Sequence, residues 1–232
     1  MTDLWPLAAS ALVFVGGHFL LSSTGLRGIL ISSIGERAYL GVYSLIAAIS
    51  LIAMIRSYLT LPYGQPLWFL YPFGGYVAVI VMPVALLLVI AGYSQPNPTS
   101  IGQDRGLRRK PIGILRITRH PVMWGVALWA IVHLLANGDM SSLLFFGAFL
   151  VLTLGGTVAI DGKKARKFGS VYDGFREQTS NLPFLAIIRR RQSIGDAVRE
   201  IGLWRLAIVV IAYGALLHLH RWVFGVSPYP GL

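Results

Sequence analysis

The chain contains no cysteine, and it contains few charged residues for its length of 232. Without cysteine, disulfides, thiol catalysis and cysteine-ligated metal centres are excluded. Charged residues make up only 12% of the sequence, hydrophobic residues make up 55%, and the mean hydropathy is +0.67. This balance lies outside the range of ordinary soluble domains and predicts a membrane protein.

Acidic residues are especially scarce, with nine Asp and Glu against 20 Lys and Arg and a net charge of +11. A positive charge of this size could indicate nucleic acid binding. Most of the basic residues, however, fall in two loops between apolar runs and not on one soluble face. We therefore interpret the charge as a signal of membrane orientation and expect no nucleic acid partner.

The apolar residues form six runs close to the length that a helix needs to cross roughly 30 Å of hydrocarbon. These runs are residues 4–21, 39–55, 75–93, 122–136, 143–160 and 206–224. The fourth run is short, so we expect it to begin before Pro121 or to lie where its neighbours thin the bilayer. The N-terminus has no basic n-region or small-residue cleavage site, so we expect the first run to be retained. The sequence predicts an all-α, polytopic membrane bundle of about six transmembrane helices.

Lys and Arg are distributed very unevenly between the two sides of these runs. The loops after the first, third and fifth runs hold 18 of the 20, which leaves only Arg56 and Arg221 for the other side. Because positively charged loops stay in the cytoplasm, both termini are predicted to lie on the other, periplasmic side of an inner membrane. Residues 161–203 are predicted to form a basic cytoplasmic loop with an interfacial segment, and residues 204–232 the last span and a C-terminal tail.

Histidines are the most conspicuous polar residues near the apolar runs. The chain has five, which are His18, His120, His133, His218 and His220, and four of the five fall within or close to a run. Ionisable groups in a span are costly and so are functional candidates, although a neutral imidazole can also simply bond across helices. Imidazoles without a thiol suit ligation of haem b, in which each ring supplies one axial nitrogen. The nearby Gly16, Gly17 and Gly125 allow either close helix packing or space for a flat cofactor.

The junction before the fourth run is the most distinctive segment. Pro121 suits the first turn of a helix, His120 lies near its N-cap, and Arg116 and Arg119 come just before. Helix N-termini carry partial positive charge, so this junction would attract a propionate or a phosphate. A plain positive-inside anchor is an equally good interpretation of the same residues.

Five segments together resemble the NnrU family of bacterial inner-membrane proteins, which is associated with nitric-oxide and denitrification functions. They are residues 16–23 (GGHFLLSS), 35–45 (GERAYLGVYSL), 113–125 (GILRITRHPVMWG), 128–139 (LWAIVHLLANGD) and 168–184 (FGSVYDGFREQTSNLPF). The family is similar to a plastid carotene isomerase, an integral membrane enzyme that holds haem b. The resemblance implies one NnrU-like membrane domain over residues 1–232.

The resemblance also implies a cofactor and its ligands. Haem b would be held by His18 and His133, in a haem-dependent isomerase or oxidoreductase that supports nitrogen-oxide metabolism. Its partners would be the lipid bilayer, haem, and a hydrophobic substrate or a respiratory protein. Ala130 stands where the isomerase has a cysteine, and no histidine occurs between His133 and His218. A redox ligand switch through cysteine is therefore not available to this chain.

Depth in the membrane leaves other ligand pairs open. His18 lies roughly 6 Å from the cytoplasmic end of its run, and His133 lies roughly 18 Å from the same side, at 1.5 Å per residue. Two ligands of one iron should lie at similar depths, which favours His18 with His120 and His133 with His218 or His220. Helix tilt could still bring His18 and His133 together.

Two further functions fit parts of the sequence. The RHP motif at the start of a span, followed by an acidic–basic stretch and FGSVYDGF, also resembles membrane methyltransferases that use S-adenosylmethionine. There His120, Asp161 and Tyr172 would line the cofactor site, although the usual Glu-Glu pair is lacking. A non-enzymatic assembly or transport factor, with histidines as structural links, is the other alternative; no inverted repeat is visible to support a transporter.

Overall fold

Helices make up the regular structure of the protein. The computed structural model describes residues 3–23, 25–62, 64–100 and 102–229. Within these ranges the only β-type pairing is an isolated bridge between Pro66 and Asp139. The elements are α1 (Trp5–Ser23), α2 (Leu26–Ile34), α3 (Glu36–Thr60), α4 (Phe73–Ser94), η1 (Asp104–Arg108), α5 (Ile114–Ile117), α6 (Pro121–Ala136), α7 (Met140–Phe168), α8 (Ser170–Gln178), α9 (Leu185–Ile188), α10 (Ile194–Ile201) and α11 (Leu203–Phe224). The all-α fold class is confirmed.

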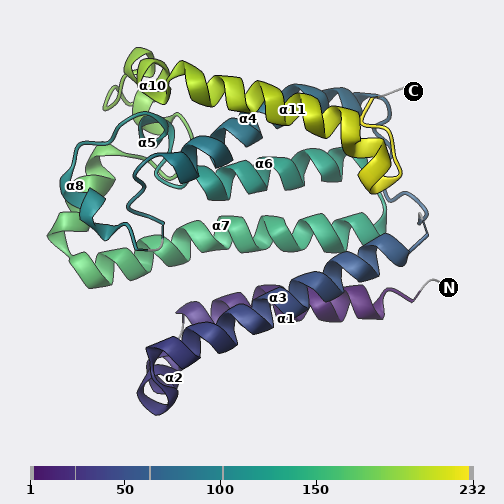
Figure 1. Ribbon diagram of the computed structural model, residues 1–232, viewed down its shortest axis with the longest axis horizontal. Coiled ribbons are helices and arrows are strands. Elements are labelled where there is room, and N and C mark those ends of the chain that lie inside the picture. The colour runs from purple at the N-terminus through teal and green to yellow at the C-terminus, as the bar shows by residue number, and fades with distance from the viewer. Residues whose placement is uncertain (1–2, 24, 63, 101, 230–232) are drawn as a thin grey trace.

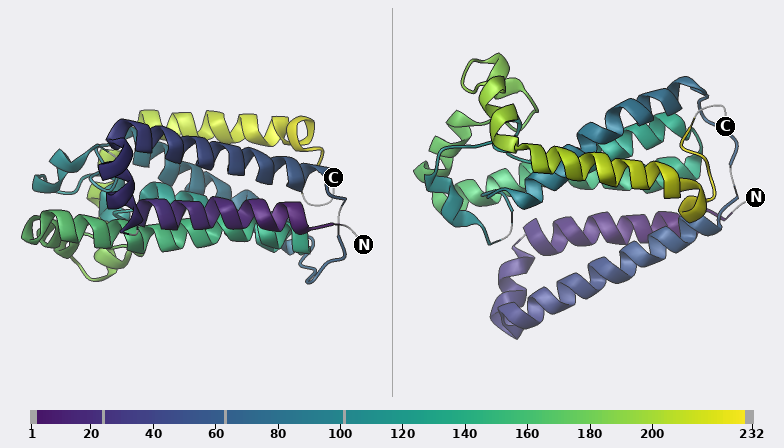
Figure 2. Two further views of the ribbon diagram at one scale, coloured as in Figure 1. Left: turned by 90° about the horizontal axis from the view of Figure 1, so that it is seen from below. Right: turned by 45° about the horizontal axis from the view of Figure 1, so that its top comes forward.

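The long helices α1, α3, α4, α6, α7 and α11 lie side by side along the long axis (Figure 1). The short helices α2, α5, α8 and α10 gather at one end of this bundle, and both marked chain ends lie at the other. Figure 2 shows the same arrangement from two more directions, with α1 running along α7. We call the end with the short helices the basic end, because the basic loops lie there. We call the opposite end the terminal end.

Five of the long helices are long and apolar enough to cross a membrane: α1, α3, α4, α7 and α11. The sixth, α6, is apolar but has only 16 residues, a length of ~24 Å. Only 6–22% of the residues in the apolar windows of these five helices are buried inside the protein, as expected of helices whose solvent is lipid. The protein is thus a polytopic membrane bundle, whereas the six crossings and the periplasmic termini stay predictions.

α6 is held in place mainly by close contact with α4. A Cβ built at Gly125 of α6 would lie 2.6 Å from Val89 Cγ2 and 2.7 Å from the Ala85 carbonyl oxygen, so no larger residue fits there. A Cβ at Gly74 of α4 would lie 2.3 Å from the Leu135 oxygen. Close helix packing is therefore the role of Gly125 in this structure.

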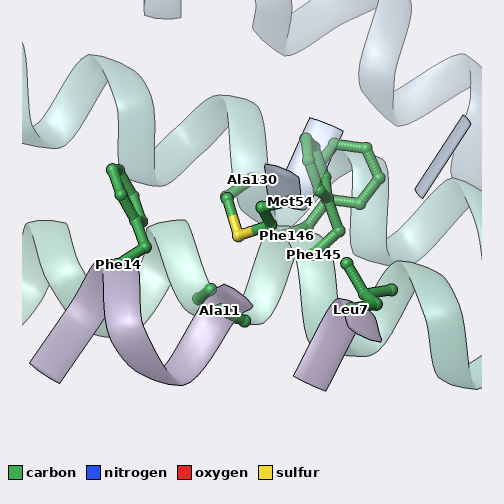
Figure 3. Close-up of a cluster of buried hydrophobic side chains, with 8 residues drawn as sticks. Leu7, Ala11, Phe14, Met54, Ala130, Phe145 and Phe146 are labelled. Carbon is green, nitrogen blue, oxygen red and sulfur yellow. The ribbon is translucent and has the colours of Figure 1, made fainter. Parts of the chain in front are cut away.

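A second contact region joins α1 and α3 to α6 and α7. Figure 3 shows its buried side chains, which come from all four helices: Leu7, Ala11, Phe14, Met54, Ala130, Phe145 and Phe146. Several aromatic rings meet here edge to face, including Phe145 with Phe146 at 5.1 Å between centroids. Because lipid is as apolar as these residues, the cluster stabilises the bundle through packing and not through removal from water.

The loop after α7 folds back on the basic end. Gly169 joins α7 to α8 with φ +52°, a conformation that favours glycine, and the chain reverses at this point. Beyond α8, α9 and α10 occupy the positions at which the interfacial segment was predicted. Exposed apolar side chains at Ile188, Ile194 and Val198 suit that prediction.

Candidate functional site

The local backbone places His120 inside the basic end. After α5, residues Thr118 and Arg119 continue to His120, and Pro121 occupies the first turn of α6. The proline has no N–H to lose at this position and fixes the entry of the chain into the helix. His120 is only 1% exposed, and its Nε2 atom lies 2.7 Å from Asp161 Oδ1 on α7. The predicted N-cap histidine is thus a buried residue that links α6 to α7.

Asp161 is the centre of a group of four side chains. The Arg119 guanidinium donates to both carboxylate oxygens, with Nε 3.0 Å from Oδ1 and a shorter bond from Nη2. The Tyr172 hydroxyl, on α8, donates to Oδ1 as well. We call Arg119, His120, Asp161 and Tyr172 the Asp161 cluster. One guanidinium balances one carboxylate, so the buried cluster is electrically neutral when His120 is neutral.

Burial sets the protonation of two members of the cluster. It lowers the pKa of His120, and this effect outweighs the opposing hydrogen bond to Asp161. Burial and then the hydrogen bond to Asp161 raise the pKa of Tyr172, so its hydroxyl stays a donor. A neutral imidazole that donates from Nε2 to Asp161 keeps a lone pair on Nδ1. This Nδ1 atom is buried and has no hydrogen-bond partner among the described residues.

Polar contacts hold the backbone that carries the cluster. The Thr99 hydroxyl donates to the Arg119 carbonyl oxygen at 2.7 Å, and the Arg119 N–H donates to the Ser180 carbonyl oxygen at 2.9 Å. The Thr118 hydroxyl accepts from the His120 N–H at 3.2 Å. Such a connected network keeps the imidazole in one orientation.

Arg116 forms a separate network one turn earlier. It binds Glu200 of α10 through two bonds of 2.8 Å, and its Nη1 donates to Gln192 at 2.6 Å. The hydrogen bonds from Arg116 lower the pKa of Glu200, which is therefore ionised at neutral pH. The anions next to Arg116 and Arg119 are thus the protein's own Glu200 and Asp161. The prediction that these arginines bind a cofactor stays a prediction.

His18 and His133 are oriented in the same way on their own helices. The Nδ1 atom of His18 lies 2.7 Å from the Phe14 carbonyl oxygen, and that of His133 lies 2.8 Å from the Trp129 carbonyl oxygen. Histidines that bind metals commonly use one ring nitrogen in this way, which fixes the other as the ligand. Each residue taken alone therefore has the orientation that ligation requires.

The position of His18 can be measured along α7, which packs against both α1 and α6. Phe14 contacts Phe149 of α7 at 5.6 Å between ring centroids. One residue beyond His18, the Phe19 ring lies against Gly155, where a built Cβ would approach it to 2.7 Å. His18 therefore lies level with about residue 154 of α7.

The other histidines lie at different levels on the same scale. His133 stacks on Phe146 with 4.9 Å between centroids, about eight residues or ~12 Å from the level of His18. His120 lies at Asp161, about seven residues or ~10 Å away on the other side. Two axial ligands must face one iron from its two sides. In this arrangement His18 and His133 lie at different levels along α7, and their joint ligation of one haem iron stays a prediction.

The last two histidines lie on α11 near the terminal end. His218 is exposed, and the Nδ1 atom of His220 lies 2.9 Å from the Val226 carbonyl oxygen. His133 also lies near this end, three residues before α6 stops, so His133 and His220 share an end of the bundle. No group of three or more His, Asp or Glu side chains that could hold a metal ion occurs in the part of the chain that the structure describes.

Sequence reasoning reached only part of this site. It selected His120, Arg116 and Arg119, but it named Asp161 and Tyr172 only for the methyltransferase alternative, and it missed Glu200 and Gln192. The scarcity of acidic residues was the available signal. A carboxylate at position 161 or 200, surrounded by many Lys and Arg, has a strong reason to be paired.

The fold and this site describe an α-helical membrane protein with a buried Arg–His–Asp–Tyr cluster at one end of its bundle. Residues 6–228 match the NnrU protein family, and the chain belongs to that family. It is 33% identical over 105 residues to the chloroplastic 15-cis-zeta-carotene isomerase of Arabidopsis thaliana, a match that covers 44% of this chain and 29% of the relative. The Zea mays isomerase is 33% identical over 82 residues, which cover 35% and 22%. The matches thus span less than a third of either relative, and no solved structure matches.

Proposed function

We propose that this protein is a membrane isomerase-type enzyme that acts on an apolar substrate, with His120 as the group that transfers a proton. The observation that carries the proposal is the buried imidazole whose Nε2 is held by Asp161, while its Nδ1 has no hydrogen-bond partner in the described part of the chain. An unsatisfied buried polar atom costs about 1–3 kcal/mol, so a structure retains one for a reason.

The arrangement suits a proton transfer without net oxidation. Nδ1 would accept a proton from a saturated carbon beside the conjugated double bonds and return it to the same carbon. While the charge is delocalised, a cis double bond can rotate to trans, and no atom is gained or lost. The lowered pKa of His120, caused by burial, keeps the imidazole neutral, so the lone pair of Nδ1 is available. Asp161 would stabilise the imidazolium that forms, and Arg119 and Tyr172 would position Asp161.

The names of the relatives support the reaction class. Both are isomerases of 15-cis-zeta-carotene, an apolar substrate. A substrate of this kind would reach the protein from the bilayer, which surrounds the exposed apolar helices. Because the matches cover less than a third of those relatives, the activity and its substrate are proposed for this chain and not transferred.

A His120→Gln variant tests the role of the imidazole. The glutamine amide can still donate to Asp161, but it supplies no acceptor at the position of Nδ1. With the protein in lipid nanodiscs and 15-cis-zeta-carotene as the probe, we expect the rate of isomer formation, followed by chromatography, to fall about 100-fold or more. A His218→Gln variant, changed at an exposed histidine, should keep the wild-type rate. Full activity in a folded His120→Gln protein would contradict the proposal.

Haem b, held by His18 and His133, is a second proposal, and it rests on the resemblance. A role in nitric-oxide or denitrification metabolism, or as an oxidoreductase, depends on it. The Nδ1 contacts of both histidines support ligation, whereas their separate levels along α7 do not. No step of the proton transfer above requires the haem.

An absorption spectrum of the purified protein tests the haem proposal. It predicts a red protein with a Soret band that shifts on reduction with dithionite, and loss of that band in both His18→Ala and His133→Ala. Loss in only one variant would show that the two residues do not share an iron. If the Soret band is retained in both variants, neither residue is a ligand, and His120, His218 and His220 are the remaining candidates.

The methyltransferase alternative gains one observation from the structure. His120, Asp161 and Tyr172, which it requires in one site, do lie together. Equilibrium binding of S-adenosylmethionine to the purified protein decides this alternative. Binding that is lost in the His120→Gln protein would favour it over the isomerase.

A further inference from the structure

A hollow of about 270 Å³ lies at the basic end, beside the buried cluster that contains Tyr172. The residues that line it are either apolar or positively charged. Pro111, Leu115 and Phe175 are buried apolar residues, Ile112 is an exposed apolar one, and Arg109 and Lys110 are exposed cations. The hollow therefore combines an apolar floor with a cationic rim.

The apolar floor is part of the fixed core of this end. Leu115 and Phe175 pack with Leu107 and Tyr172 in one buried cluster. Phe175 lies 6.0 Å from Tyr172 between ring centroids, and the Tyr172 hydroxyl donates to Asp161. Ile112 is 42% exposed and adds an apolar side chain that the protein itself does not cover.

The cations of the rim have no acidic partner. Neither Arg109 nor Lys110 forms an ion pair with any residue in the described ranges. The acidic residue of the same loop, Asp104, already pairs with Lys164 and Lys167. The rim thus keeps an uncompensated positive charge, which raises the local concentration of anions.

We propose that this hollow binds a phosphate ester that carries an apolar chain. Arg109 and Lys110 bind the phosphate, since a guanidinium matches phosphate oxygens with two parallel bonds and an ammonium adds a point charge. The apolar chain lies over Ile112, Leu115 and Phe175. The volume is close to the lower limit of small-molecule sites, roughly 300–1,000 Å³, which accommodates a head group and the start of a chain. The same chemistry occurs in a bilayer phospholipid and in a water-soluble phosphorylated amphiphile.

Titration of the purified full-length protein in neutral phosphatidylcholine nanodiscs tests the site. The probe is dioctanoyl phosphatidic acid, with inorganic phosphate for comparison. We expect saturable binding of the probe and at least 100-fold weaker binding of inorganic phosphate, which has no chain for the floor. Arg109→Gln with Lys110→Gln should lower the affinity for the probe at least tenfold, and Ile112→Ser should lower it several-fold.

A charge-matched control separates a site from general attraction. Arg189→Gln with Arg190→Gln removes two exposed cations of the same end that do not line the hollow, and it should leave the affinity unchanged. Nanodiscs that contain phosphatidylglycerol identify the source: competition with the probe indicates a bilayer lipid, and no competition indicates a soluble amphiphile. Equal losses in both double variants, equal affinity for inorganic phosphate, or no binding of the probe would each overturn the proposal. None of these measurements depends on the isomerase activity, so the two proposals can fail separately.

Discussion

Replacing Asp161 by Ala is expected to lower the free energy of unfolding by about 3–5 kcal/mol, because it leaves a buried charge without its partner. The Arg119 side chain is 9% exposed and loses both of its carboxylate contacts. The His120 ring loses the acceptor of its Nε2 atom, and the Tyr172 hydroxyl loses its acceptor as well. Thermal unfolding in detergent measures the change, which corresponds to a fall in melting temperature of about 10 °C for a chain of this size.

An exposed ion pair at the same end of the bundle provides the matched control. Asp196 pairs with Arg199 within α10, and the arginine is 79% exposed. Surface pairs contribute only about 0–1 kcal/mol, so Asp196→Ala should unfold close to the wild-type temperature. Adding Arg119→Leu to Asp161→Ala should restore part of the loss, since the charge without a partner is then gone. Equal melting temperatures for Asp161→Ala and Asp196→Ala would contradict a structural role of the cluster.

Replacing Gly125 by Ala is expected to cost about 1–3 kcal/mol through overpacking of the contact between α6 and α4. The added Cβ would lie 2.7 Å from the Ala85 carbonyl oxygen and 3.2 Å from the Val89 nitrogen. These are backbone atoms of a neighbouring helix, so they cannot move aside as the end of a flexible side chain can. We expect a lower melting temperature in detergent.

Gly16 provides the control for this substitution, because it is also a helical glycine of a long apolar helix. A Cβ built there meets nothing within 4 Å. Since alanine is the better helix former by about 1 kcal/mol, Gly16→Ala should be neutral or slightly stabilising. If both variants unfold at one temperature, close packing is not the role of Gly125.

The sequence predicted the presence of the long helices better than the positions at which they end. The run at 122–136 corresponds closely to α6, which begins at Pro121. The run at 143–160 is only part of α7, which continues to Phe168. An apolar run ends where charged residues begin, at Asp161, but a helix can continue through Lys, Ala and Arg because these residues are good helix formers. That extension carries Asp161 past the apolar run to the position at which it meets His120.

The predictions about the glycines and about a bound anion could also not be completed from the sequence, because both depend on contacts between distant segments. Close packing and space for a cofactor were both open at Gly16 and Gly125. The structure puts Gly125 in a tight helix contact and leaves Gly16 open, which depends on the neighbours of each helix. An anion was expected near Arg116 and Arg119. The structure places Glu200 and Asp161 there, from segments 84 and 42 residues away along the chain.

The sequence by itself determined the all-α membrane class, the position of the long helices and the family, because apolar length and local motifs depend on residues that are near one another in the chain. It also selected His120 as a residue at a helix start. Only the tertiary structure decided that His120 is buried against Asp161, that Tyr172 completes the cluster, and that His18 and His133 lie at different levels. The physical reason is that such contacts depend on the register between packed helices, and the register is set by side-chain interlocking over the whole bundle.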